Sequence, residues 1–171
     1  MTDAKNPQNG AHSASVPAGV ANPQAQVRVL GQFIKDLSFE NPSVGKVEIT
    51  PNEQPNIRIE VSVNAQNMAP NVFESVTSLT AHCSVKAGVL YELELQYGAA
   101  LQLENVPEQS LEPFLLINCP ALTFPFVRRL VADITREGGF PPLLLDPIDF
   151  AGLYMQRQKS GQGGAGGPAV A

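Results

Sequence analysis

The chain has 171 residues, a length that suits one domain, and its 16 acidic and 11 basic side chains give a net charge of −5 at pH 7. With only 16% charged residues and an acidic balance, it lacks the basic surface that binds nucleic-acid backbones or anionic membranes. No continuous apolar run approaches the roughly 20 residues of a membrane span, so we expect neither a nucleic-acid partner nor direct membrane insertion.

The two ends of the chain differ in composition from its middle. The N-terminal segment is rich in Asn, Gln, Pro, Gly and Ala, and it lacks the basic start and apolar centre of a secretory signal. We therefore expect residues 1–25 to be disordered, residues 26–158 to form a single domain, and residues 159–171 to be a flexible Gly/Ala-rich tail. A cytoplasmic location follows as the default.

Alternation of apolar and polar residues predicts four strands in the first part of the domain. They are Val27–Phe39, Ile57–Ala65, Val72–Val85 and Val89–Tyr97, of which the second alternates most regularly. The third has a Ser/Thr-rich middle that leaves its register less defined. One apolar face per strand and short turns predict an antiparallel sheet with one face in water.

The first of these strands has two unlike faces. Odd positions would share an apolar face, namely Val27, Val29, Phe33, Leu37 and Phe39. Even positions would share a mixed face, namely Arg28, Leu30, Gln32, Ile34, Asp36, Ser38 and Glu40. Gly31 indicates a bulge or a close approach of another backbone.

Helical spacing replaces the alternation after this sheet. Apolar residues at i, i+3, i+4 and i+7 predict a long amphipathic helix that ends at Gly138-Gly139: Val127, Leu130, Val131 and Ile134. Before it, Ser110 is expected to cap a short helical piece over residues 111–118. Pro120 and Pro125 should kink the helix or separate it from that piece.

The segment that follows is apolar but cannot be regular. Pro141, Pro142 and Pro147 prevent helix or central strand, so its large side chains must cover a core or line a groove. Asp149 can then cap a short second helix. The candidate groove residues are Phe140, Leu143, Leu144, Leu145, Phe150, Leu153, Tyr154 and Met155.

Together these elements predict an α+β fold: a four-stranded antiparallel sheet with one face covered by a long C-terminal helix and a short second helix. The apolar residues exceed what one helical layer can cover, which favours an interface, with a dimer or a tetramer of D2 symmetry as the expected assembly. The alternative is that the loop after residue 138 simply caps its own domain.

Groups for catalysis are lacking. His82 is the only histidine of the expected domain, and Cys83 and Cys119 are expected to be reduced thiols spaced too far apart for a zinc motif. No phosphate-binding glycine motif is present. We therefore predict no enzyme activity, no cofactor, no metal site and no ATP binding. The outward pair Glu92 and Glu94 is, by default, a solvated face.

Two sets of motifs resemble the SecB family of bacterial protein-export chaperones. The first is KDLSFENP at 35–42; the second comprises CP at 119–120, FPFVR at 124–128, GGFPPLLLDPIDF at 138–150 and LYM at 153–155. The resemblance implies a cytosolic, ATP-independent holdase that binds unfolded precursor proteins and delivers them to the SecA translocation ATPase. It also implies a homotetramer, a dimer of dimers with the long helices packed between two extended sheets.

The resemblance further implies a docking site for SecA on the acidic outward face of the sheet. The matching positions are Asp36, Glu40, Glu92 and Glu94, although the position of Glu92 is commonly apolar in relatives. Two alternatives stay open at this point: a non-catalytic scaffold that binds one fixed folded partner through the apolar loop at 140–155, and a small hydrolase that uses Cys119 or the glutamates.

Overall fold

The computed structural model describes residues 24–46, 53–160 and 169–170, so most of both predicted tails lies outside the described residues. Four long strands form an antiparallel sheet: β1 (Gln26–Glu40), β2 (Asn56–Ala69), β3 (Val72–Val85) and β4 (Gly88–Glu104). A two-residue strand, β5 (Ala169–Val170), adds to its edge, and the strand order is β1-β4-β3-β2-β5. The expected four-stranded antiparallel sheet is confirmed, and β5 was not foreseen.

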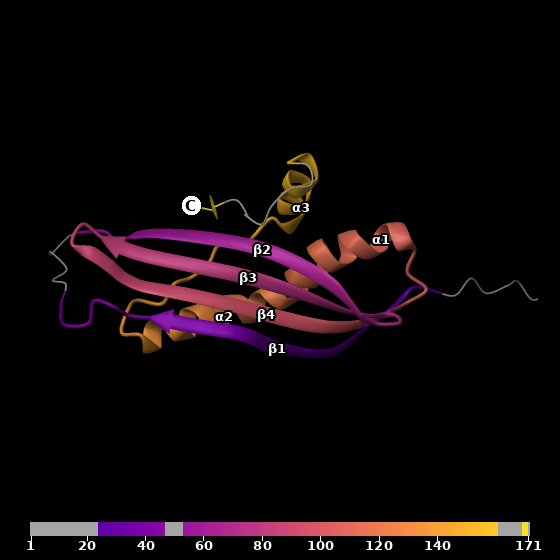
Figure 1. Ribbon diagram of the computed structural model, residues 1–171, viewed down its shortest axis with the longest axis horizontal. Coiled ribbons are helices and arrows are strands. Elements are labelled where there is room, and N and C mark those ends of the chain that lie inside the picture. Colours follow the sequence, from indigo (N-terminus) through magenta and orange to yellow (C-terminus); the bar gives the residue numbers. More distant parts are fainter. Residues whose placement is uncertain (1–23, 47–52, 161–168, 171) are drawn as a thin grey trace, which may run out of the picture.

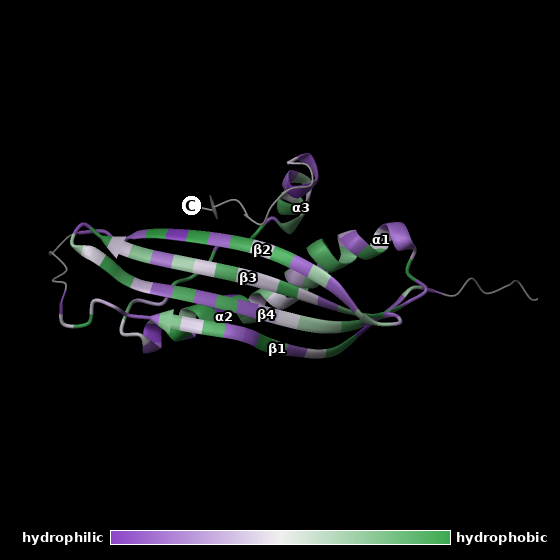
Figure 2. Ribbon diagram, in the orientation of Figure 1, coloured by the Kyte–Doolittle hydropathy of each residue, from purple (hydrophilic) through white to green (hydrophobic). Residues whose placement is uncertain are grey.

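The helical segments lie on one face of this sheet, with the last of them beside the edge of β2 (Figure 1). They are α1 (Glu108–Pro113), the π-helical segment η1 (Phe114–Asn118), α2 (Cys119–Glu137) and α3 (Phe150–Lys159). Buried apolar residues of β2, β3 and β4 meet those of α2, α3 and the loop between them in the main core cluster: Val61, Leu79, Ala81, Leu93, Leu95, Tyr97, Val127, Val131, Leu145 and Phe150. The two-layer α+β fold is therefore confirmed, and Figure 2 shows the alternating bands of hydropathy along the strands.

The predicted faces of β1 are wrong in its middle, because the strand changes register twice. Its pairing with β4 shifts between Val29 and Gly31 and again between Ile34 and Asp36. Each bulge adds one residue and so exchanges the two faces. Gln32 and Ile34 consequently lie opposite Ala99 and Tyr97, on the helix-covered face of β4, while Phe33 lies opposite Gly98 on the other face. The bulge that Gly31 indicated is present.

Phe33 explains why residue 98 is a glycine. A Cβ atom on Gly98 would lie 2.7 Å from Cε2 of Phe33, so the ring occupies the space that any side chain at 98 would need. The aromatic side chain thus packs over the backbone of β4 on the outward face of the sheet.

The expected break between the helices is instead a local change of helix type. Residues Glu108–Glu137 form one continuous helix, and Ser110 does not cap it, since the helix begins at Glu108 after Pro107. Within η1 the N–H of Cys119 donates to the carbonyl oxygen of Phe114, five residues back.

Pro120 explains this irregularity. In the same five-residue pattern the carbonyl oxygen of Leu115 would receive an N–H from residue 120, which a proline lacks. Ser75 of β3 supplies the missing donor: its Oγ donates to that oxygen at 2.7 Å. The proline is tolerated because the sheet completes the hydrogen bonding of the helix.

The long helix is apolar and long enough to cross a membrane by length and composition alone. Its use in the fold is different: Val127, Val131 and Thr135 of one face are buried against the sheet, and the charged Arg128 and Arg129 are exposed. This one-sided pattern is that of an amphipathic core helix.

One side of β1 is not covered by any other part of the chain that the structure describes. Large apolar residues of β1 and of the neighbouring face of α2 are exposed, namely Val27, Val29, Leu30, Ile34, Leu37, Leu122 and Phe126. β1 is also an edge strand, paired only with β4 among the described residues. Apolar surface next to an unpaired strand edge marks a contact surface for another chain.

Candidate functional site

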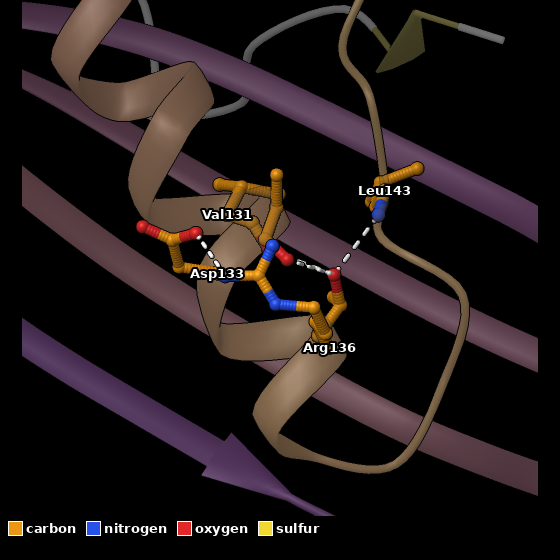
Figure 3. A network of polar contacts seen from close by, with 6 residues as sticks. Val131, Asp133, Arg136 and Leu143 are labelled. Atoms are coloured by element: carbon orange, nitrogen blue, oxygen red, sulfur yellow. Dashed lines mark hydrogen bonds and ion pairs between the residues drawn. The ribbon is translucent and has the colours of Figure 1, made fainter.

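The apolar loop between α2 and α3 is held by the last turns of α2. The backbone N–H of Leu143 donates to Thr135 Oγ1 at 2.9 Å, and this hydroxyl donates in turn to the carbonyl oxygen of Val131 at 2.8 Å (Figure 3). The N–H of Phe140 donates to the carbonyl oxygen of Thr135 at 3.1 Å. Thr135 is fully buried, so a single residue fixes the start of the loop at two points.

Local contacts define both ends of the loop. Gly139 has φ +88°, a left-handed conformation that favours glycine, and the chain reverses there. Phe140 then packs on Tyr91 with ring centroids 4.9 Å apart. At the other end Asp149 caps α3 as predicted, because its Oδ1 accepts the N–H of Gly152 at 2.9 Å.

The structure divides the eight predicted groove residues into buried and accessible ones. Leu145 and Phe150 are 3% and 4% exposed and belong to the core, so within one subunit they support the loop and present little surface. Leu144 and Met155 are 64% and 55% exposed. The others are half-buried: Phe140, Leu143, Leu153 and Tyr154. Accessible apolar groups therefore remain both on the irregular loop and on α3.

A second open feature lies next to α3 and was missed by sequence reasoning. A hollow of about 330 Å³ is lined by residues of β2, α1, η1 and α3: Ala65, Gln66, Leu111, Glu112, Leu115, Leu116 and Arg157. None of the predicted groove residues lines it. The helical spacing of Leu111, Leu115 and Leu116 was the available signal, but nothing local showed that β2 would face them.

The four predicted docking residues lie together on the outward face of the sheet. Glu40 pairs across the strands with Glu92, and Glu94 is opposite Ser38, two residues from Asp36. All four side chains are exposed. Glu92 contacts His82, whose Nδ1 lies 3.0 Å from Glu92 Oε1. Among the described residues the other three have no ion-pair partner, so the patch keeps a concentrated negative charge.

The thiols and the histidine form no catalytic arrangement in the described part of the chain. Burial raises the pKa of the Cys83 thiol and that of the Cys119 thiol, which keeps both protonated and weakly nucleophilic. Burial likewise raises the pKa of Tyr91, beside Cys83. His82 is on the outward face, away from both thiols, and residues 24–46, 53–160 and 169–170 contain no group of three metal-ligating side chains.

Comparison with known proteins places this arrangement in a family. The family model described as preprotein translocase subunit SecB matches residues 20–161. The protein-export protein SecB of Azorhizobium caulinodans is 48% identical over 136 residues, covering 80% of this chain and 85% of that protein. The protein-export protein SecB of Hyphomonas neptunium is 46% identical, covering 96% and 99%.

A solved structure agrees in fold. A SecB-like chaperone of Mycobacterium tuberculosis, determined in complex with a peptide from an antitoxin, superposes with a TM-score of 0.60 at 15% identity, covering 72% of this chain and 90% of that one. The family match spans β1 to β4, the long helix, the apolar loop and α3 together, whereas β5 lies beyond it. This chain therefore belongs to the SecB family of protein-export chaperones.

Proposed function

We propose that the chain is an ATP-independent holdase in the cytoplasm that binds unfolded precursor proteins and passes them to the SecA translocation ATPase. The observation that carries this proposal is the apolar surface of the loop and α3: Leu144 of the loop and Met155 of α3 stay accessible, while Thr135 and Leu145 hold the loop backbone in place. Accessible apolar groups on a fixed support bind many non-native segments without requiring one sequence. Binding the unfolded state alone delays folding by mass action, so no nucleotide is needed.

The proposed client surface consists of the predicted groove residues, with the accessible ones in contact with client and Leu145 and Phe150 as their support. The hollow beside Arg157 extends it along β2. A client chain that reaches several such surfaces gains affinity through effective concentration, on the order of 10²–10⁴-fold. This gain requires an oligomer.

The proposed oligomer is a homotetramer, a dimer of dimers built from a single folded domain at residues 26–158. It is supported by the apolar surface of β1 and α2 that the described residues leave exposed and by the edge of β1 that none of these residues pairs with. Closed symmetry would bury this surface on every subunit and remove the exposed edge.

The proposed SecA contact is the acidic patch of Asp36, Glu40, Glu92 and Glu94. Exposed carboxylates of this kind attract a basic segment and govern mainly its association rate and salt sensitivity. Because the patch and the apolar loop lie on opposite faces of the sheet, a client and the ATPase can be bound at the same time.

A refolding-arrest assay with several unrelated unfolded proteins tests the holdase function. We expect arrest of each of them without ATP and no binding of their native forms; a scaffold for one folded partner would give the reverse. Leu144→Ser should weaken arrest, whereas Met68→Ser, which removes an equally exposed apolar side chain at the end of β2, should not. Sedimentation must show the same assembly for both variants.

Charge reversal tests the docking proposal separately. Asp36→Lys and Glu94→Lys should weaken binding of the purified ATPase about tenfold at low salt and less at high salt, with client arrest unchanged. Glu137→Lys reverses an exposed charge at the end of α2 and should leave docking unchanged. Normal docking by the two patch variants would place the contact elsewhere.

A further inference from the structure

The outer edge of β2 is occupied by two parts of the C-terminal segment. β5 pairs antiparallel with β2, with Val170 opposite Ile59 and Ala169 opposite Glu60. Four residues further along, Arg157 Nη1 of α3 donates to the carbonyl oxygen of Val63 at 3.0 Å. Figure 1 shows β5 as the short yellow strand on the β2 side of the sheet.

The alternation of backbone groups makes these two contacts part of one edge. Successive residues of an antiparallel strand direct their N–H and C=O groups to opposite sides, so Ile59, Val61 and Val63 direct theirs the same way. The Val63 carbonyl oxygen accepts from Arg157 of α3 and so points away from β3. The backbone N–H and C=O groups of Ile59, Val61 and Val63 therefore lie on the outer edge. This edge therefore offers a row of backbone donors and acceptors to an added strand.

We propose that the C-terminal Ala169–Val170 segment is a built-in occupant of the β2 edge and competes there with extended segments of bound clients. An unpaired edge accepts any extended backbone, and an apolar dipeptide resembles a client segment in both shape and chemistry. The competition rests on the proposed holdase function; the strand pairing does not.

The chain's own tail is favoured over other occupants by its tether. Eight residues lie between Ser160, after α3, and Ala169, so the Cα atoms of these two residues can be at most about 30–32 Å apart. A tether this short gives an effective concentration on the order of millimolar at the edge, above that of a second copy at assay concentrations. Two residue pairs are too few to hold the edge permanently, so a longer client segment can displace them.

The test compares the full chain with Val170→Pro and Val170→Thr. Proline removes the N–H that residue 170 brings to the edge, while threonine keeps it and preserves the β-branched shape. Hydrogen exchange at the Ile59 amide, measured without any client, reports the pairing of β5 with β2. Titration with reduced, alkylated lysozyme then reports the affinity for a client. A tail that occupies the edge between half and nine-tenths of the time raises the apparent Kd about twofold to tenfold.

We expect Val170→Pro to exchange the Ile59 amide faster and to bind the alkylated lysozyme about twofold to tenfold more tightly, with Val170→Thr unchanged in both. Unchanged exchange in the proline variant overturns the pairing; if its mass by sedimentation has also risen, the edge belongs to a second copy. Faster exchange with unchanged affinity overturns the competition. If no form binds the alkylated lysozyme, the holdase function and the competition fail together, while the exchange result still decides the strand pairing.

Discussion

Replacing Thr135 by valine tests whether one hydroxyl holds the apolar loop between α2 and α3 in place. Thr135 Oγ1 accepts the N–H of Leu143 at 2.9 Å and donates to the carbonyl oxygen of Val131 at 2.8 Å. Valine has nearly the same volume and fills the same fully buried site, so the substitution removes the hydroxyl without opening a cavity. Whatever the variant loses is due to hydrogen bonding.

The expected loss of unfolding free energy depends on which hydrogen bonds the two partners of the hydroxyl keep in the variant. The carbonyl of Val131 still receives the backbone N–H of residue 135 in the helix, so its loss is small. The N–H of Leu143 loses its acceptor in a partly buried place, and an unsatisfied buried donor costs about 1–3 kcal/mol. We therefore expect the free energy of unfolding to fall by about that amount, with the loop loosened first.

Urea unfolding followed by circular dichroism measures the free energy of unfolding, and hydrogen exchange at the Leu143 amide measures the loop. All forms must be compared at one protomer concentration, because the stability of an oligomer depends on it. Thr80→Val is the matched control: Thr80 is exposed on the outward face, so we expect a change within about 0.5 kcal/mol. If Thr135→Val matches this control and the Leu143 amide stays protected, the loop is held by apolar packing alone.

Three further changes test the packing. Ser75→Ala leaves the helix carbonyl opposite the proline unsatisfied, and we expect a loss of about 1–3 kcal/mol in urea unfolding. Leu145→Ala should cost about 2–5 kcal/mol and Leu144→Ala less than about 0.5 kcal/mol, with only the latter acting mainly on client capture; the opposite order would refute the assignment of buried and accessible sides. Gly98→Ala should displace the Phe33 ring and lower the thermal midpoint, and adding Phe33→Ala should restore part of the loss; two independent, additive losses would contradict the contact.

Much of the fold could be predicted because the residue pattern of each segment favours the same element that the folded chain contains. β2 and β4 alternate regularly, the apolar stripe of α2 has helical spacing, and Asp149 is a typical capping residue. In each of these cases the deciding information lies within a few residues of the chain. The acidic outward face was predictable for the same reason, since Glu92 and Glu94 alternate with buried leucines along one strand.

The features that the sequence did not predict have a common cause: each depends on contacts between segments far apart in the chain. The bulges of β1 are set by pairing with β4, so Gly31 hinted at one of them while nothing local indicated the second, before Asp36. Pro120 correctly indicated an irregular helix, but only Ser75, 45 residues earlier in the chain, shows why the helix continues. The loop after α2 has no period, so its sequence could not separate inward Leu145 from outward Leu144.

The bond from Ser75 to Leu115 also determines where the long helix sits along the sheet. A helix that packs on an apolar sheet can occupy nearly equivalent positions one turn apart, about 5.4 Å, because leucine-like side chains tolerate an exchange of neighbours. Sliding by one turn would leave both the serine hydroxyl and the carbonyl beside the proline without partners inside the core. Apolar packing thus stabilises the contact between helix and sheet, while one hydrogen bond selects a single position of the helix along the sheet.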